Sequence, residues 1–178
     1  MAVLIGTGAF GKVYKETVNG VVCAVKKIID YDSDDLKEVK LFESVRHKYI
    51  IKPRTHYFED CVMGESLNLV MEYGDIGTLT SFTTEQVKRM NTVKEKSVWN
   101  VTCHLSEALD YLHSRFSPIL HRDVKPDNVL GVTDPSTGAI MWKLADFGLA
   151  TEANRDFRGR FFTSTTVGTP IYMAPEVN

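Results

Sequence analysis

The sequence has few cysteines, no long apolar run and almost no net charge, and each shortage excludes a class of protein. Its three cysteines, Cys23, Cys61 and Cys103, lie far apart and form no Cys-x-x-Cys pair, so neither a zinc site nor a disulfide framework is indicated. No stretch approaches the roughly 18 apolar residues that a membrane span needs, and the apolar run at the N-terminus is too short for a signal peptide. We therefore expect a cytoplasmic or nuclear protein without membrane insertion.

The balance of charge gives no electrostatic reason to expect nucleic acid or an anionic membrane as the main partner. Lysine and arginine total 21 against 23 aspartate and glutamate, which leaves a net charge of -2. Apolar residues make up 43% of the chain and charged residues 25%, values that exclude a disordered protein. A chain of 178 residues can bury a core, as one domain or as two lobes of one.

What the sequence does contain is a polar octet from His121 to Asn128, with the sequence His-Arg-Asp-Val-Lys-Pro-Asp-Asn. Pro126 restricts its own backbone and that of the preceding residue. The Asp123 carboxylate can accept a proton from a hydroxyl nucleophile, Lys125 can neutralise a phosphoryl group, and Asn128 offers an oxygen ligand for Mg²⁺. These groups suit phosphoryl transfer, although a short polar loop is also ordinary turn chemistry.

A second motif, Gly-x-Gly-x-x-Gly at residues 6–11, is shared by two families. A dinucleotide-binding fold requires a helix after the third glycine, whereas a kinase requires a second strand. Residues 12–15 lead into Asn19-Gly20, which is the strongest short signal for a β-hairpin, and no amphipathic helix fits before that turn. The context therefore favours a kinase over a dinucleotide-dependent oxidoreductase.

The motifs together resemble those of the protein kinase family, and the resemblance covers essentially the whole chain. The strand sequence Cys-Ala-Val-Lys at 23–26 resembles the family's Val-Ala-Ile-Lys, and the octet resembles its catalytic loop. Asp-Phe-Gly follows at 146–148 and Ala-Pro-Glu at 174–176. Lys125 and the segment from Gly168 to Glu176 resemble the serine/threonine class.

The resemblance implies transfer of the γ-phosphoryl group of Mg-ATP to a serine or threonine hydroxyl of a protein substrate. Lys26 would hold the α and β phosphates, and it would pair with Glu38, which lies nine residues before His47. The implied catalytic residues are Asp123, Lys125, Lys26 and Glu38, and the implied metal ligands are Asn128 and Asp146.

ATP would lie between the glycine loop and a hinge that follows the strand ending near Tyr73. Val13 would contact adenine, the backbone of Glu72 and Gly74 would hydrogen-bond it, and Met71 would limit the pocket behind it. The alternative is that Met71 is simply a hydrophobic-core residue on a half-buried strand. The residues implied to bind ATP are Ile5, Gly6, Thr7, Gly8, Gly11, Val13, Ala24, Lys26, Met71, Glu72, Gly74 and Leu130.

A hydroxyl-rich stretch, Thr163-Ser164-Thr165-Thr166, lies between the two last motifs. Arg122 beside the catalytic aspartate is typical of kinases that are activated by a phosphate in this segment. We expect Thr165 to be the main phosphosite, with Thr163 and Ser164 as further candidates and an upstream activating kinase as a partner. The alternative is a hydroxyl-rich loop without regulation.

The predicted fold is α+β, a bilobal protein-kinase-like fold. Residues 1–74 would form the N-terminal lobe, a small antiparallel sheet with one helix whose apolar positions run from Leu36 to Val45. Residues 75–178 would begin a mainly helical C-terminal lobe. There, Thr83 and Gln86 predict a capping box, residues 97–113 a helix, and residues 131–139 a loop.

The chain ends shortly after Ala-Pro-Glu, before the helices that normally complete the larger lobe of this family. We therefore expect a fragment or a truncated catalytic domain. The alternative function is a catalytically incompetent kinase-like fragment, an ATP-binding or scaffold module.

Overall fold

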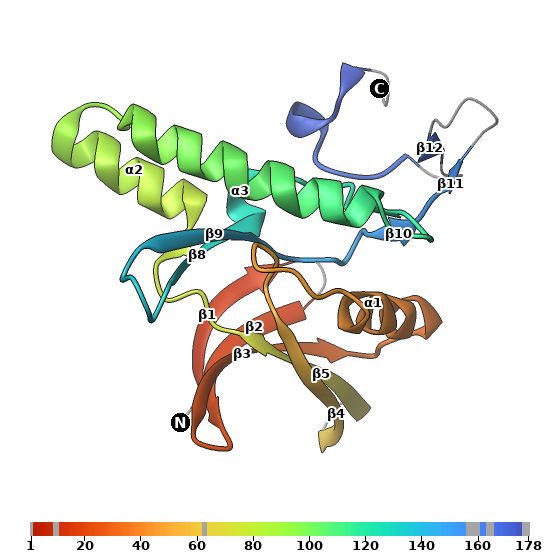
Figure 1. The fold of residues 1–178 in the computed structure, drawn as a ribbon. Coiled ribbons are helices and arrows are strands. Elements are labelled where there is room, and N and C mark those ends of the chain that lie inside the picture. Colours follow the sequence, from red (N-terminus) through yellow and green to blue (C-terminus); the bar gives the residue numbers. More distant parts are fainter. Residues whose placement is uncertain (1, 9–10, 62–63, 156–160, 163–165, 176–178) are drawn as a thin grey trace.

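The computed structural model describes residues 2–8, 11–61, 64–155, 161–162 and 166–175. The first half of the chain forms a five-stranded antiparallel sheet in the order β1-β2-β3-β5-β4. Helix α1 (Ser33–Glu43) packs beside this sheet (Figure 1). The strands are β1 (Val3–Gly8), β2 (Gly11–Val18), β3 (Val21–Ile29), β4 (Pro53–Cys61) and β5 (Gly64–Glu72). This architecture confirms the predicted antiparallel sheet with one helix.

The β-hairpin that favours a kinase over a dinucleotide-binding fold for the glycine motif is present. Asn19 and Gly20 join β2 to β3, with φ angles of 51° and 77°. Positive φ at both turn residues is what a two-residue type I′ hairpin requires. Strand β2 begins at Gly11 itself, so a strand follows the third glycine, as predicted for a kinase.

Helix α1 begins at a capping box. The Asp32 carboxylate accepts hydrogen bonds from the backbone N–H groups of Asp34 and Asp35 at 2.7 and 3.1 Å, and the Asp35 side chain accepts one from the Asp32 N–H. The helix ends at Glu43, so the prediction that it extends to Val45 is wrong. Val45 is fully buried in the turn that follows, which is why the apolar pattern continues past the end of the helix.

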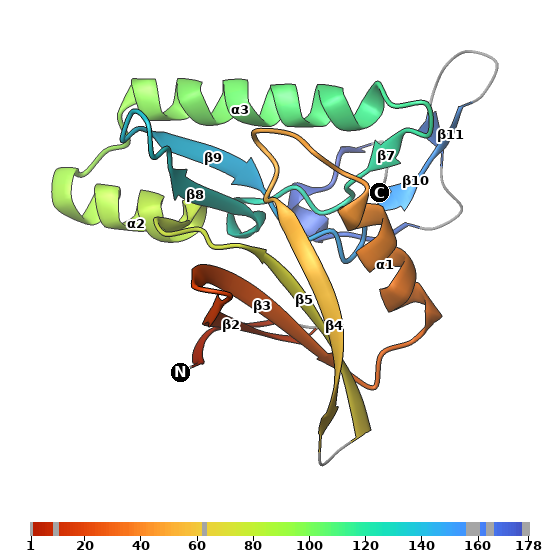
Figure 2. The ribbon, with the colours of Figure 1, turned by 60° about the horizontal axis from the view of Figure 1, so that its bottom comes forward.

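The second half contains two helices and small sheets. Helix α3 (Glu95–His113) covers one face of the sheet β6-β8-β9, and α2 (Leu79–Met90) contacts β6, β8 and η1 (Figure 2). None of the helices that the structure describes is long and apolar enough to cross a membrane. The remaining elements are β6 (Gly77–Thr78), β7 (Ile119–Leu120), η1 (Pro126–Asn128), β8 (Val129–Thr133), β9 (Ile140–Leu144), β10 (Thr151–Glu152), β11 (Asn154–Arg155), β12 (Phe161–Phe162) and η2 (Pro170–Tyr172).

The predicted capping box at Thr83 is wrong, because α2 begins one turn earlier. Thr78 is the N-cap, and its hydroxyl oxygen accepts a hydrogen bond from the Ser81 N–H at 3.1 Å. Thr83 lies inside the helix and donates to the Leu79 carbonyl at 2.8 Å. The predicted loop 131–139 is also too long, since β8 and β9 extend into it from both sides.

Main-chain hydrogen bonds join the segment before β4 to strand β9. The Ile51 N–H donates to the Leu144 carbonyl and the Leu144 N–H donates to the Tyr49 carbonyl, each at 2.9 Å. Nearby, the Lys143 Nζ lies 2.8 and 2.9 Å from the two carboxylate oxygens of Glu72. The larger of two hydrophobic clusters among the described residues also contains residues from both halves of the chain. The division into lobes near residue 74 stays a prediction.

The close packing of β8 against Ile76 and Trp142 makes Gly131 a sensitive position. A Cβ there would lie 2.7 Å from the Cβ of Ile76 and 3.1 Å from the Cζ3 of Trp142. We expect Gly131→Ala to lower the free energy of unfolding by about 1–3 kcal/mol, because the added methyl overpacks this contact. Urea denaturation measures the effect. Gly8→Ala is the control, since a Cβ on Gly8 meets nothing within 4 Å, and an equal loss in both variants would contradict the packing explanation.

Candidate active site

A buried ion pair joins the sheet to helix α1. The Lys26 Nζ on β3 lies 2.9 Å from a carboxylate oxygen of Glu38, and the two side chains are only 9% and 8% exposed. The same Nζ lies 3.5 Å from the Asp146 carboxylate. Burial alone would lower the pKa of Lys26, but Glu38 and Asp146 outweigh it and raise that pKa above its ordinary value. The lysine is therefore a fixed positive charge between two carboxylates that are far apart in sequence.

Phe147 and His121 hold the loops that carry the polar groups. The buried Phe147 ring stacks on Phe42 of α1 at 5.1 Å and meets the edge of His121 at 4.9 Å. The His121 Nε2 lies 3.0 Å from the Ala145 carbonyl, and its Nδ1 accepts a hydrogen bond from the Asp123 N–H at 3.4 Å. Burial lowers the pKa of His121 despite the opposing hydrogen bond to Ala145, so the ring is neutral at pH 7. A neutral ring with Nε2–H as donor satisfies both contacts.

Three side chains converge on the Asp123 carboxylate. The Thr169 hydroxyl donates to Oδ1 at 2.6 Å, and both Lys125 Nζ and Asn128 Nδ2 lie 2.8 Å from Oδ2. Lys125 also donates to the Thr169 hydroxyl at 2.8 Å, which closes a ring of contacts. Burial would raise the pKa of Asp123, but Lys125, Thr169 and Asn128 together hold it below its ordinary value. The carboxylate is therefore ionised and fixed in orientation.

Backbone strain is concentrated at the same loops. Arg122 and Asp146 adopt φ angles of 64° and 60°, a region that costs non-glycine residues free energy. Gly168 has a φ of 136°, and a Cβ there would lie 2.5 Å from the Arg122 carbonyl. Gly168 thus lets the segment with Thr169 approach the loop closely enough for the hydroxyl to reach Asp123.

The proposed metal ligands have suitable chemistry for Mg²⁺. Asn128 donates through its Nδ2 to the Asp123 carbonyl and carboxylate, and its amide oxygen accepts no side-chain hydrogen bond from the described residues, so this oxygen can ligate a cation. Asp146 has a side chain that is 40% exposed, next to Lys26 and the Gly148 N–H. Amide and carboxylate oxygens are hard ligands of the kind that Mg²⁺ prefers.

The residues predicted to bind ATP lie on β1, β2, β3, β5 and β8 and in the connection after β5. Gly6 pairs with Val13 across the first hairpin, and Ala24 pairs with Met71 across β3 and β5. A Cβ on Gly74 would lie 2.9 Å from the Cβ of Leu130, so these two residues are in contact. The remaining members of the set are Ile5, Thr7, Gly8, Gly11 and Glu72, and their role toward a nucleotide stays a prediction.

Two contacts at the site were missed by the sequence reasoning. Thr169 was predicted only as part of the segment from Gly168 to Glu176, and its contact with Asp123 was not. Its position between a glycine and a proline was a signal for a backbone that can approach another loop closely. The pairing of Lys143 with Glu72 had no local signal, because 71 residues separate them. Thr163, Ser164 and Thr165, the predicted phosphosites, lie outside the described residues, as does Glu176.

Three histidines make stability depend on pH near neutrality. Burial lowers the pKa of His47, His104 and His121 below the ordinary 6.5. The unfolded chain therefore binds more protons below about pH 6.5, so the stabilisation is complete above this pH and is lost as the pH falls.

We expect the free energy of unfolding to fall as the pH drops below about 6.5, by up to about 1.4 kcal/mol per pH unit for each histidine that titrates. Urea denaturation at several pH values measures this, and His121→Phe should flatten the dependence. Stability that rises on acidification, or an unchanged slope in the variant, would contradict the assignment.

The chain matches the family model "Protein kinase domain" over residues 1–178. It is 33% identical over 177 residues to serine/threonine-protein kinase cst-1 of Caenorhabditis briggsae and 34% identical over 179 residues to serine/threonine-protein kinase 10 of Danio rerio. It is 35% identical over 181 residues to cell division control protein 7 of Schizosaccharomyces pombe. The chain belongs to the protein kinase domain family.

These matches cover 97% of this chain but only part of each relative. The matched region is 32% of the Caenorhabditis protein, 17% of the Danio protein and 15% of the Schizosaccharomyces protein. The chain thus spans less than a third of the length of each of these relatives. The fold predicted from the motifs is confirmed at the level of the family.

Proposed function

We propose that this chain is an ATP-dependent protein serine/threonine kinase, acting on a serine or threonine hydroxyl of a protein substrate. The observation that carries the proposal is the coordination of Asp123 by Lys125, Asn128 and Thr169. This arrangement keeps a carboxylate ionised and oriented beside a fixed cation, which is what proton acceptance next to a transferring phosphoryl group needs.

The contacts of Asp123 indicate where the substrate hydroxyl binds. An ionised carboxylate has about four acceptor positions, two on each oxygen. Oδ2 accepts from Lys125 and Asn128, whereas Oδ1 accepts from Thr169 alone among the described residues. The open position on Oδ1 is where we place the substrate hydroxyl. The oxygen of the substrate hydroxyl forms a bond to the γ-phosphorus of ATP, and the bond from that phosphorus to the β,γ-bridging oxygen breaks. The proton of the hydroxyl passes to Asp123.

The remaining groups position the nucleotide. Lys26, held by Glu38, would contact the α and β phosphates, and Lys125 would stabilise the γ-phosphoryl group. Asn128 and Asp146 would hold Mg²⁺, which when bound supplies positive charge to the phosphates. Adenine would lie between the first hairpin and Leu130, near the hinge that we place at residue 74. Catalysis in this scheme is chiefly positioning and electrostatic stabilisation.

A phosphorylation assay tests the proposal directly. The chain is incubated with γ-labelled ATP, Mg²⁺ and a generic basic protein substrate, and the labelled residues are identified. We expect labelled phosphoserine or phosphothreonine, and no label when the metal is removed with EDTA. Mg-ATP binding without any transfer would overturn the proposal and favour the alternative, an ATP-binding or scaffold module. Label on tyrosine alone would overturn the serine/threonine assignment.

We also propose that phosphorylation of the segment before Gly168 regulates activity, with Thr165 as the main site and an upstream kinase as its source. Arg122 lies next to Asp123 and could bind such a phosphate. Replacing Thr163, Ser164, Thr165 and Thr166 together by alanine should then lower activity, as measured by the same assay. Full activity in this variant would overturn the regulatory proposal and leave the proposed reaction intact.

A further inference from the structure

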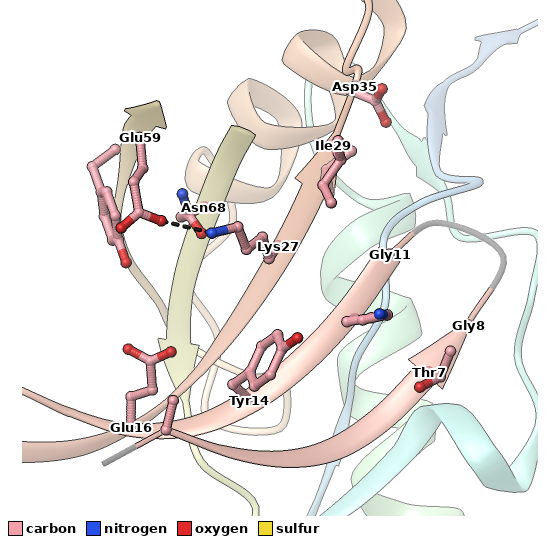
Figure 3. A pocket seen from close by; sticks show the side chains of 14 residues that line it. Thr7, Gly8, Gly11, Tyr14, Glu16, Lys27, Ile29, Asp35, Glu59 and Asn68 are labelled. Atoms are coloured by element: carbon pink, nitrogen blue, oxygen red, sulfur yellow. Dashed lines mark hydrogen bonds and ion pairs between the residues drawn. The ribbon is translucent and has the colours of Figure 1, made fainter. Parts of the chain in front are cut away.

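A cavity of about 750 Å³ lies over one face of the five-stranded sheet, and Lys27 is among the residues that line it (Figure 3). Side chains alternate along a strand, so Lys27 projects to the opposite side from Lys26. The strand register places Asn68 beside Lys27, and Tyr57 beside Asn68. The strand residues that shape the cavity are Tyr14, Glu16, Lys27, Tyr57, Glu59 and Asn68.

The floor of this cavity is polar. Asn68 is only 2% exposed, and its Nδ2 donates to the Ser66 carbonyl and hydroxyl oxygens at 3.3 and 3.2 Å. Within the part of the chain that the structure describes, no hydrogen bond reaches the Asn68 Oδ1. An amide oxygen that accepts no hydrogen bond from the described residues and lies in a polar cavity can accept one from a ligand that donates hydrogen bonds.

The sides of the cavity carry two carboxylates from opposite parts of the sheet. Glu59 on β4 pairs with the Lys27 Nζ at 2.7 Å, as Figure 3 shows. Glu16 on β2 has no ion pair among the described residues. Glu16, Glu59 and Tyr57 all line the cavity. Burial, together with the negative charges of Glu16 and Glu59, raises the pKa of Tyr57. Side chains of β2 and β4 therefore face one cavity, although β3 and β5 lie between these strands in the sheet.

We propose that this cavity binds an arginine side chain presented by an extended segment of a partner protein. A guanidinium can stack on the face of a tyrosine, pair in a bidentate manner with Glu16 and donate to the Asn68 oxygen at the same time. The charge of the lining favours a cation, since Glu16, Asp35 and Glu59 outnumber Lys12 and Lys27. The volume lies in the range of ligand sites and exceeds a single side chain, which suits a short segment.

This cavity lies on the other face of the sheet from Lys26 and Asp146, and it shares only Thr7, Gly8 and Gly11 of the glycine loop with the residues predicted to bind ATP. The proposal therefore does not depend on phosphoryl transfer, and a chain without activity could still bind the segment. An acidic segment is excluded by the same geometry, since it would place carboxylates against Glu16 and Glu59.

Titration calorimetry with a blocked tetra-arginine peptide at physiological salt tests the proposal. We expect measurable binding to the 178-residue chain and about tenfold weaker binding to Glu16→Gln, which removes a charge-assisted contact. Tyr57→Leu should weaken binding by a similar factor because it removes the cation–π surface. Glu95→Gln, the same chemical change on α3, is the matched control and should bind as the wild type does.

The binding position needs its own measurement, because a basic peptide could also bind near Asp123. Amide chemical shifts of the ¹⁵N-labelled chain should change at β2, β4 and β5 on addition of tetra-arginine. Shifts confined to residues 121–128 would overturn the proposal. Absence of binding, equal affinity for Glu16→Gln, or equal binding of a blocked tetra-glutamate peptide would also overturn it. If Tyr57→Leu does not fold, Glu16→Gln alone decides, since Glu16 lacks an ion pair whose loss would destabilise the chain.

Discussion

Asp123→Asn is expected to lower the rate of phosphoryl transfer by about a thousandfold, within the range for loss of a general base. The substitution keeps the size of the side chain but replaces one carboxylate oxygen by an amide nitrogen, which cannot accept a hydrogen bond. If the nitrogen replaces Oδ2 it faces the donors Lys125 and Asn128, and if it replaces Oδ1 it faces the Thr169 hydroxyl. The variant also loses the negative charge that accepts the substrate proton. Mg-ATP binding should change little, because Lys26, Glu38 and Asp146 remain in place.

The measurement is transfer of labelled phosphate from ATP, with Mg-ATP affinity and the midpoint of thermal unfolding recorded in parallel. Asp127→Asn is the matched control, since Asp127 lies in the same loop with an exposed side chain. It should retain the wild-type rate. Wild-type activity in Asp123→Asn would remove the proton acceptor from the mechanism, and an equal loss in both variants would mean that the loop responds to any loss of charge.

Lys26→Met should be the most destabilising of the single substitutions considered, at about 3–5 kcal/mol, because it leaves the Glu38 carboxylate buried without its cation. Glu38 is 8% exposed, so water cannot replace the lost contact. The neighbouring pair provides a control. Lys27 and Glu59 are 27% and 52% exposed in their side chains, and Lys27→Met should cost about 0–1 kcal/mol.

A double variant separates the structural and functional roles of this pair. Lys26→Met with Glu38→Leu replaces both charges by apolar groups, which is often neutral in a buried site, so most of the lost stability should return. Affinity for Mg-ATP and phosphoryl transfer should not return, because the phosphates still lack the lysine. Urea denaturation followed by tryptophan fluorescence measures the recovered stability, and nucleotide titration measures the affinity for Mg-ATP. Recovered ATP affinity in the double variant would contradict the proposed contact with the phosphates.

The parts of the fold that were predictable carry local signals. The hairpin at Asn19-Gly20 was predictable because positive φ is encoded in the two residues themselves. The partnership of Lys26 with Glu38 was inferred from family spacing, and the structure places the two side chains together. The limits of α1 were less predictable, because Val45 is buried by tertiary contacts and so continues the apolar period beyond the helix.

The errors and omissions arise from contacts that sequence spacing does not encode. Thr83 and Thr78 are equally suitable N-cap residues by type. In the structure β6 ends at Thr78, which is the N-cap, and α2 begins at Leu79. Thr169 reaches Asp123 across 46 residues because Gly168 permits a close approach to Arg122. The cavity lined by Lys27, Tyr57 and Asn68 was not predicted either, since it depends on side chains that several strands bring to one face of the sheet and not on any short motif.

The backbone bonds between residues 49–51 and Leu144 have a consequence for tolerance to mutation. Asp146 follows Leu144 by two residues, so these bonds set the position of its carboxylate relative to the sheet that carries Lys26. Their donors are main-chain N–H groups, which every residue except proline supplies. The spacing between the two charged groups is thus maintained by contacts that most side-chain substitutions leave unchanged, and proline at position 51 or 144 is the replacement that removes a donor directly.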